Sequence, residues 1–91
     1  MINEMIEQAA AFEKSGQLDL AKGIYNVALD LLPEADKTTR ARILLLRGRL
    51  NYRLKNSQGA LADLQTAFQL DPTLADVLTG EFSKFYKESC H

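Results

Sequence analysis

The stretch LDLAKGIYNVALDLLP, residues 18–33, recurs as SQGALADLQTAFQLDP, residues 57–72. In each copy an alanine is followed four residues on by a large apolar residue, and three residues later by another alanine. That spacing is one face of a helix. Each copy ends at a proline, which cannot continue a helix. The shift superposes Ala21 on Ala60, Tyr25 on Leu64, Ala28 on Ala67, Leu29 on Phe68, Leu31 on Leu70 and Pro33 on Pro72.

A second amphipathic helix is expected before each copy. The first spans about residues 2–14 and ends at Ser15-Gly16, because glycine suits the left-handed position that follows a helix. The other spans about residues 37–54, with Asp36 as its N-cap. We expect Lys55-Asn56 to close it and Ser57 to cap the helix after it.

The end of the chain predicts one more helix, over about residues 74–89. Its apolar positions have helical spacing: Leu74, Val77, Leu78, Phe82 and Phe85. Thr73 and Asp76 form a weak capping box at its start. The expected chain is all-α, with five helices: one repeat over about 2–35, a second over about 36–72, and a capping helix over about 74–89.

This pattern resembles the tetratricopeptide repeat family, whose signature is small residues, a turn, alanines around a bulky residue and a closing proline. The first repeat carries it at Ala9, Gly16, Ala21, Tyr25, Ala28 and Pro33; the second carries it at Gly48, Ala60, Leu64, Ala67 and Pro72. Four positions depart from the family pattern: Met5, Leu44, Asn51 and Lys55. The resemblance implies a right-handed superhelix of helical hairpins that binds proteins. The repeat is longer than the family's by about five residues, which we place at Asp36–Arg40.

Size and composition favour one small soluble domain. The chain has 91 residues, 46% of them hydrophobic and 25% charged, and a net charge of −1. Its start is not that of a signal peptide, and its longest apolar run, Ile43–Leu46, is far below the roughly 20 residues of a membrane span. The single cysteine, Cys90, points mildly to a reducing compartment. We expect a cytoplasmic protein that does not interact with membranes.

Catalytic or metal chemistry is not expected. The only histidine is His91, next to Cys90 at the chain end, and a zinc site needs three or four ligands. No glycine-rich phosphate loop is present in the sequence. We therefore expect a chain that is not an enzyme and uses no cofactor.

The charges are distributed very unevenly. Residues 37–55 contain seven of the eleven basic residues and no acid, so this segment carries +7 and the rest of the chain −8. In the family, the first helix of each repeat lines the concave groove. By that geometry, Arg42, Arg49 and Arg53 form one stripe facing the groove, beside Leu45 and Tyr52. The expected flanks are Tyr86 and Lys87 on one side and Ala10, Glu13 and Lys14 on the other.

Arginine binds carboxylates through two parallel hydrogen bonds, and tyrosine adds rigid contact area. We therefore predict a protein-interaction adaptor whose groove holds an acidic or C-terminal segment of a partner. The competing interpretation is that the arginines only neutralise acids on adjacent helices; the candidates are Glu4, Glu7, Glu13, Asp63, Asp76 and Glu81.

Two other functions stay open. The chain could be a scaffold piece that self-associates through exposed repeat ends, although a capped monomer is favoured over a homodimer. It could also bind nucleic acid or another anion, which the acidic remainder of the chain disfavours. The carboxylate clamp of the family's chaperone-tail binders is absent, since its places are taken by Ile6, Ala10 and Leu46.

Overall fold

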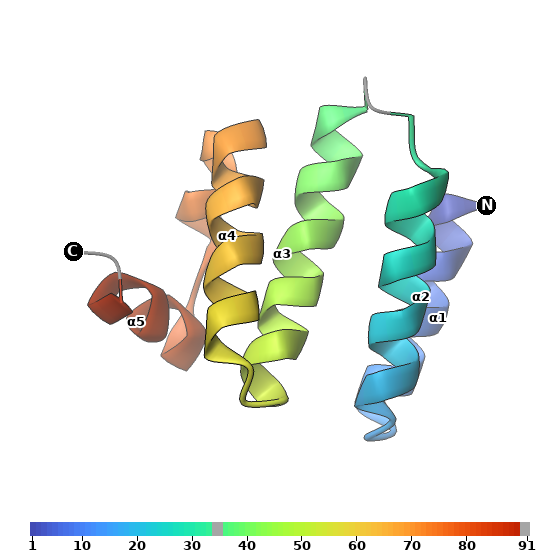
Figure 1. Ribbon diagram of the computed structural model, residues 1–91, viewed down its shortest axis with the longest axis horizontal. Coiled ribbons are helices and arrows are strands. Elements are labelled where there is room, and N and C mark those ends of the chain that lie inside the picture. Colours follow the sequence, from blue (N-terminus) through green and yellow to red (C-terminus); the bar gives the residue numbers. More distant parts are fainter. Residues whose placement is uncertain (34–35, 90–91) are drawn as a thin grey trace.

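A computed structural model describes residues 1–33 and 36–89, and within these ranges the chain is all-helical, as predicted. Five α-helices follow one another, with a 3₁₀ helix, η1, before the last (Figure 1). Their bounds are α1 Ile2–Lys14, α2 Leu18–Leu31, α3 Lys37–Arg53, α4 Ser57–Leu70, η1 Pro72–Val77 and α5 Gly80–Ser89. Cys90 and His91 lie outside the described residues.

The helices form two hairpins side by side. The first is α1–α2 and the second is α3–α4, with α3 lying next to α2 (Figure 1). The 3₁₀ helix and α5 lie at the far end, beside α4, so that α1 and α2 form one end of the molecule and α5 the other. The molecule measures 37 × 32 × 19 Å along its principal axes.

The turns of the two hairpins have the same backbone geometry. Gly16 closes α1 with φ 85°, and Lys55, its counterpart in the second repeat, closes α3 with φ 65°. In each turn the next residue donates its N–H back into the helix: Gln17 to the Phe12 carbonyl at 2.9 Å, and Asn56 to the Asn51 carbonyl at 2.8 Å. This is a Schellman motif, in which the residue after the cap is left-handed. Lys55 occupies a position that favours glycine.

One N-cap is the residue predicted from the sequence, and another is a different residue. Asp36 caps α3, as predicted, by accepting a hydrogen bond from the Thr39 N–H at 3.1 Å. The prediction that Ser57 caps α4 was wrong. Asn56 does so instead, since its Oδ1 accepts from the Gly59 N–H at 3.1 Å and Ser57 is already the first helical residue.

The repeated face of α2 and α4 forms the core. The four alanines that recur in both copies, Ala21, Ala28, Ala60 and Ala67, are fully buried, and Tyr25 and Leu64, between them, are 1% and 0% exposed. The small alanines bring neighbouring helices close together, and the large residues fill the remaining space. The residues buried from α1 and α3 complete this core: Ala9, Ala41, Ile43, Leu44 and Leu50.

The third helix is longer than the first, with 17 residues against 13. The extra residues predicted at Asp36–Arg40 therefore include the N-cap and first turn of α3.

The last helix begins later than predicted. The expected helix over 74–89 is interrupted: η1 ends at Val77, Leu78 is extended with ψ 133°, and α5 begins at Gly80 with φ 68°. The expected capping box was also wrong, because Asp71 accepts hydrogen bonds from the N–H and hydroxyl of Thr73. Apolar spacing alone did not reveal the glycine that lets the chain change direction.

Candidate functional site

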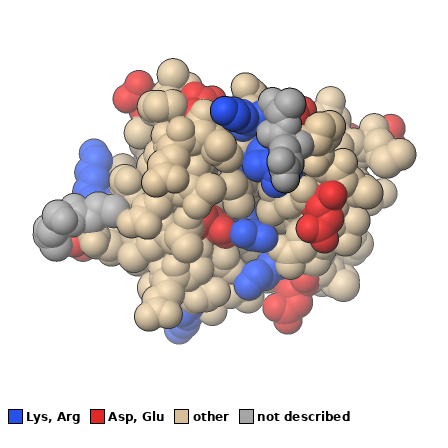
Figure 2. All heavy atoms as spheres, turned by 45° about the horizontal axis from the view of Figure 1, so that its top comes forward, with Lys and Arg blue, Asp and Glu red and all other residues tan. Residues whose placement is uncertain are grey.

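The basic residues of α3 lie on two different faces of the helix. Arg40 and Arg47 point toward the first hairpin, where the Arg40 Nη2 donates to the Leu32 carbonyl at 3.2 Å. Arg42, Arg49 and Arg53 lie on the other face, as their spacing predicted. In the view of Figure 2, basic and acidic side chains lie against each other near the middle of the molecule, with uncharged residues on both sides.

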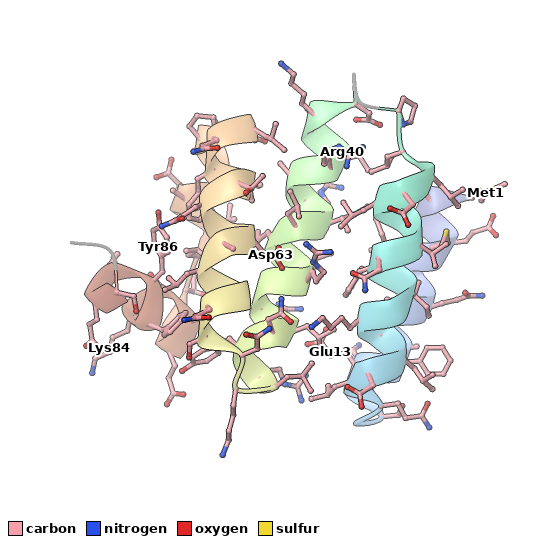
Figure 3. All side chains as sticks on the ribbon, viewed as in Figure 1. Met1, Glu13, Arg40, Asp63, Lys84 and Tyr86 are labelled. Carbon is pink, nitrogen blue, oxygen red and sulfur yellow. The ribbon has the colours of Figure 1, made fainter. Side chains whose placement is uncertain are left out.

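Arg47 joins three helices. Its Nε and Nη2 donate to the two carboxylate oxygens of Asp63 on α4, at 2.9 and 2.7 Å, and its Nη1 donates to Asn26 on α2 at 2.8 Å. Asn51 donates a further hydrogen bond to Asp63 at 2.9 Å. Asp63 is almost fully buried and lies between α3 and α4 (Figure 3). This arginine therefore holds the two hairpins together.

Glu13 of α1 binds two of the predicted groove arginines. Its Oε2 lies 2.8 Å from Arg53 Nη1 and 3.8 Å from Arg49 Nη2. The Glu13 side chain is only 8% exposed, whereas those of Arg49 and Arg53 are 51% and 46% exposed. Arg42 is exposed and makes no ion pair with a described residue. With one carboxylate for three arginines, this face keeps a charge of +2.

A hollow of about 110 Å³, lined mainly by apolar side chains, borders Arg49. Arg49 is its one charged lining residue; the others are Leu45, Leu46, Val77, Leu78, Thr79 and Phe82. It lies between α3 and the segment that joins η1 to α5. We call the hollow, together with Arg42, Arg49 and Arg53, the α3 groove. The groove combines exposed positive charge with an apolar floor.

Both predicted tyrosines pack against other aromatic rings. Tyr52 packs against α5, with ring centroids 5.5 Å from Phe82 and 4.7 Å from Phe85. It also borders a shallow depression of about 300 Å³ that is lined by Glu81, Lys84, Phe85 and Glu88. Tyr52 therefore serves mainly to attach α5 to α3.

Tyr86 and Lys87 do not join the groove lining. The Tyr86 ring packs edge-on against Phe68 of α4, with centroids 5.0 Å apart, and Figure 3 shows Tyr86 on the α5 side of the molecule. Lys87 is exposed in the last turn of α5. The expectation that these two residues flank the arginines came from the family's geometry, in which the first and the last helix are the neighbours of the third; here the last helix, α5, is the short segment Gly80–Ser89.

The groove lining includes residues that the sequence did not single out. Val77 and Phe82 were expected as ordinary helix-face residues, but they border the groove because the chain turns between them. Leu46 was noted only as the replacement of a clamp residue. Glu13 was expected from the sequence as a flank of the arginines and as one of the acids that could neutralise them, and it lies buried against Arg49 and Arg53.

Two buried oxygens around these polar clusters have no hydrogen-bond donor among the described residues: Glu13 Oε1 and Asn51 Oδ1. Close by, burial raises the pKa of Tyr25 above 10.0. The negative charge of Glu13 raises it further, and Arg49 partly opposes the increase. The Glu13 carboxylate therefore pairs with two groove arginines and also raises the pKa of a tyrosine in the core.

Residues 1–33 and 36–89 contain no group of three or more His, Cys, Asp or Glu side chains placed to bind a metal ion together. None of the described helices combines the length and apolar character needed to cross a bilayer. No protein-family model, no curated protein and no solved structure matches the chain.

Proposed function

We propose that this chain is a non-catalytic, cytoplasmic protein-interaction module with tetratricopeptide-like hairpins, and that its α3 groove binds an acidic segment of a partner protein. The observation that carries the proposal is the incomplete neutralisation of the groove. Arg42 has no described ion-pair partner, and Arg49 lies 3.8 Å from a carboxylate that is closer to Arg53.

The apolar hollow supports the same function. A segment that alternates acidic and apolar residues matches the groove, with carboxylates on Arg42 and Arg49 and an apolar side chain against Leu45 and Phe82. Interfaces of this kind gain affinity from a buried apolar anchor and gain specificity and association rate from charge. The small size of the hollow favours a single leucine- or valine-sized anchor over a large ring.

The arginines of the other face do not take part in the proposal. Arg40 and Arg47 are engaged by a carbonyl, a carboxylate and an amide within the chain. Removing them would damage the fold and would report nothing about binding. The test therefore separates groove arginines from structural ones.

The test measures binding of two fluorescent peptide pools by anisotropy. One pool alternates acidic with apolar residues, and the other has lysine in place of the acids. The double variant Arg42→Glu/Arg49→Glu keeps the Arg53–Glu13 pair. The double variant Lys37→Glu/Lys55→Glu makes the same change in net charge at exposed positions outside the groove.

We expect the acidic pool to bind the unaltered chain and the groove variant to lose at least tenfold in affinity. The Lys37/Lys55 variant should stay within about threefold, and circular dichroism should show both variants folded. Equal losses in the two variants would mean that only net charge matters. Stronger binding of a mixed oligonucleotide pool in low salt would instead favour the nucleic-acid alternative.

A further inference from the structure

The outer face of α2 is apolar and uncovered. Leu20, Val27 and Leu31 are 55%, 50% and 55% exposed, which makes them three of the five most exposed large apolar side chains described. Ile24 is half-buried and lies between them. Their spacing of four, three and four residues puts all four on one stripe, which is the pattern of a helix–helix seam. We call this stripe the α2 end face.

The stripe is at the end of the molecule. By helical geometry, Leu20, Ile24, Val27 and Leu31 share one side of α2, nearly opposite Leu18, Tyr25 and Leu29, which pack into the core. Figure 1 shows α3 on one side of α2 and α1 behind it, and the described chain leaves the remaining side open. Met1, the most exposed large apolar residue described, also lies at this end (Figure 3).

The internal repeat relates this end of the molecule to the side of the second hairpin that meets α2. The second hairpin contacts α2 through Arg40 and Arg47, and Arg47 also holds Asp63. The shift that superposes the two copies places Met1 at the position of Arg40 and Ile24 at that of Asp63. Arg40 thus contacts α2 at a position where the first hairpin has the exposed Met1. Asp63 is bound through Arg47, which also reaches α2, at a position where the first hairpin has the half-buried Ile24.

Gly23 borders the stripe and is exposed. A Cβ atom at this position would meet nothing within 4 Å. A glycine inside a helix costs about 1 kcal/mol relative to alanine, and nothing in the described fold offsets that cost. A glycine beside an apolar seam lets another helix backbone approach closely.

The charges beside the stripe indicate what kind of helix fits. Asp19 and Asp30 lie on its exposed side, next to Gly23, and neither pairs with a described residue. Lys22, the only basic residue of α2, points to nearly the opposite side of the helix from the stripe. A second copy of this chain would bring four aspartates to one seam, and opposing like charges disfavour that arrangement.

We propose that the α2 end face docks an amphipathic helix of another protein, one that carries apolar residues at heptad spacing and lysine or arginine at its edges. The apolar residues pack on Leu20, Val27 and Leu31, the helix backbone passes over Gly23, and the basic residues reach Asp19 and Asp30. This surface is separate from the α3 groove and prefers the opposite charge.

The probe is a synthetic helical peptide of about five turns with leucine at heptad positions, lysine at the flanks and alanine elsewhere, labelled with fluorescein. A second peptide has glutamate in place of lysine. Anisotropy gives affinities, and amide chemical shifts locate the contact. The variant Val27→Asn tests the stripe, and Thr66→Asn is its matched control, because Thr66 is a β-branched, exposed residue at the same repeat position on α4.

We expect the lysine peptide to bind at least tenfold more tightly than the glutamate peptide and to shift amides of α2. Val27→Asn and Gly23→Leu should each reduce that affinity at least fivefold, and Thr66→Asn less than twofold. The double reversal Asp19→Lys/Asp30→Lys should invert the preference between the two peptides.

Three results would overturn the proposal. One is equal binding of the two peptides, and another is a contact mapped away from α2. The third is concentration-dependent self-association in sedimentation velocity that Val27→Asn abolishes, since the occupant would then be a second copy of this chain.

Discussion

Arg47 and Asp63 form a two-pronged ion pair across the α3–α4 hairpin, with Nε–Oδ2 and Nη2–Oδ1 distances of 2.9 and 2.7 Å. The Asp63 side chain is 8% exposed, so without its arginine it would keep a buried charge that only Asn51 contacts. Arg47→Ala should therefore lower the free energy of unfolding by about 3 kcal/mol, which is typical of breaking a buried pair. Urea denaturation followed by circular dichroism measures it.

The control for this prediction is the exposed pair Lys84–Glu88, at 3.9 Å. Lys84→Ala should change stability by less than about 0.5 kcal/mol, because exposed pairs contribute little. If Arg47→Ala costs no more than Lys84→Ala, the network does not hold the hairpins together.

The repeat made the hairpins predictable, because alanines and large residues recur at positions that must be buried together. Ala28 and Ala67, for example, are both fully buried. The roles of individual arginines were not predictable in the same way. Arg47 and Arg49 are near neighbours on α3 and look alike in the sequence, yet one meets partners on α4 and α2 and the other faces the groove.

The C-terminal helix shows a different limit. Helical spacing of apolar residues continues from Leu74 to Phe85 through a change of direction, so periodicity alone predicts one continuous helix. The left-handed conformation of Gly80, with φ 68°, is what separates η1 from α5. A single glycine does not reveal its conformation in the sequence, and the shape of the groove depends on it.

Two glycines inside helices should respond to alanine in opposite directions. At Gly48 the added Cβ would lie 3.2 Å from the Asp63 Cβ and 3.3 Å from the Ala60 carbonyl oxygen, so α3 and α4 would have to separate. Gly48→Ala should destabilise the chain by about 1–2 kcal/mol. Gly23→Ala meets no neighbour and should stabilise it by about 0.5–1 kcal/mol. Thermal unfolding at low micromolar concentration measures both changes in stability. A change in the same direction for both variants would contradict the described packing.

Lys55 has a left-handed backbone conformation, with φ 65°, at the position that glycine occupies in the first hairpin. Because a side chain is strained there, Lys55→Gly should raise the free energy of unfolding by about 1 kcal/mol. Gly16→Ala should lower it by a similar amount. Lys55→Ala provides the control, since it removes the charge and keeps the strain. A stabilisation by Lys55→Ala equal to that by Lys55→Gly would assign the effect to charge.

Tyr25 should make the fold sensitive to alkaline pH. Its pKa in the folded chain is raised above 10.0 by burial and by Glu13, so the unfolded chain loses the phenolic proton first. The contribution of Tyr25 to stability therefore changes only above the unfolded pKa of about 10. In that range the folded state binds more protons than the unfolded state, so the free energy of unfolding falls as the pH rises. Linkage thus makes the folded chain less favoured as the pH rises from the unfolded pKa to the folded pKa. Tyr25→Phe should flatten this decline in denaturation curves between pH 9 and about 11.5, while Tyr52→Phe should leave it in place. A decline of equal slope in both variants would contradict the prediction.

Glu13 partly neutralises the groove, so removing its charge should strengthen acidic binding while weakening the fold. Glu13→Gln keeps the size of the side chain and an oxygen for Arg53, and it raises the charge of the three arginines and this residue from +2 to +3. We expect a loss of about 1 kcal/mol in stability, because a charged hydrogen bond becomes a neutral one. The acidic peptide pool should bind several times more tightly at low salt, and the gain should shrink as salt is added.

Glu4→Gln, at an exposed site on α1, makes the same change in net charge and is the control. If both variants strengthen binding equally, the effect belongs to the whole molecule; if neither does, the α3 groove is not the binding site.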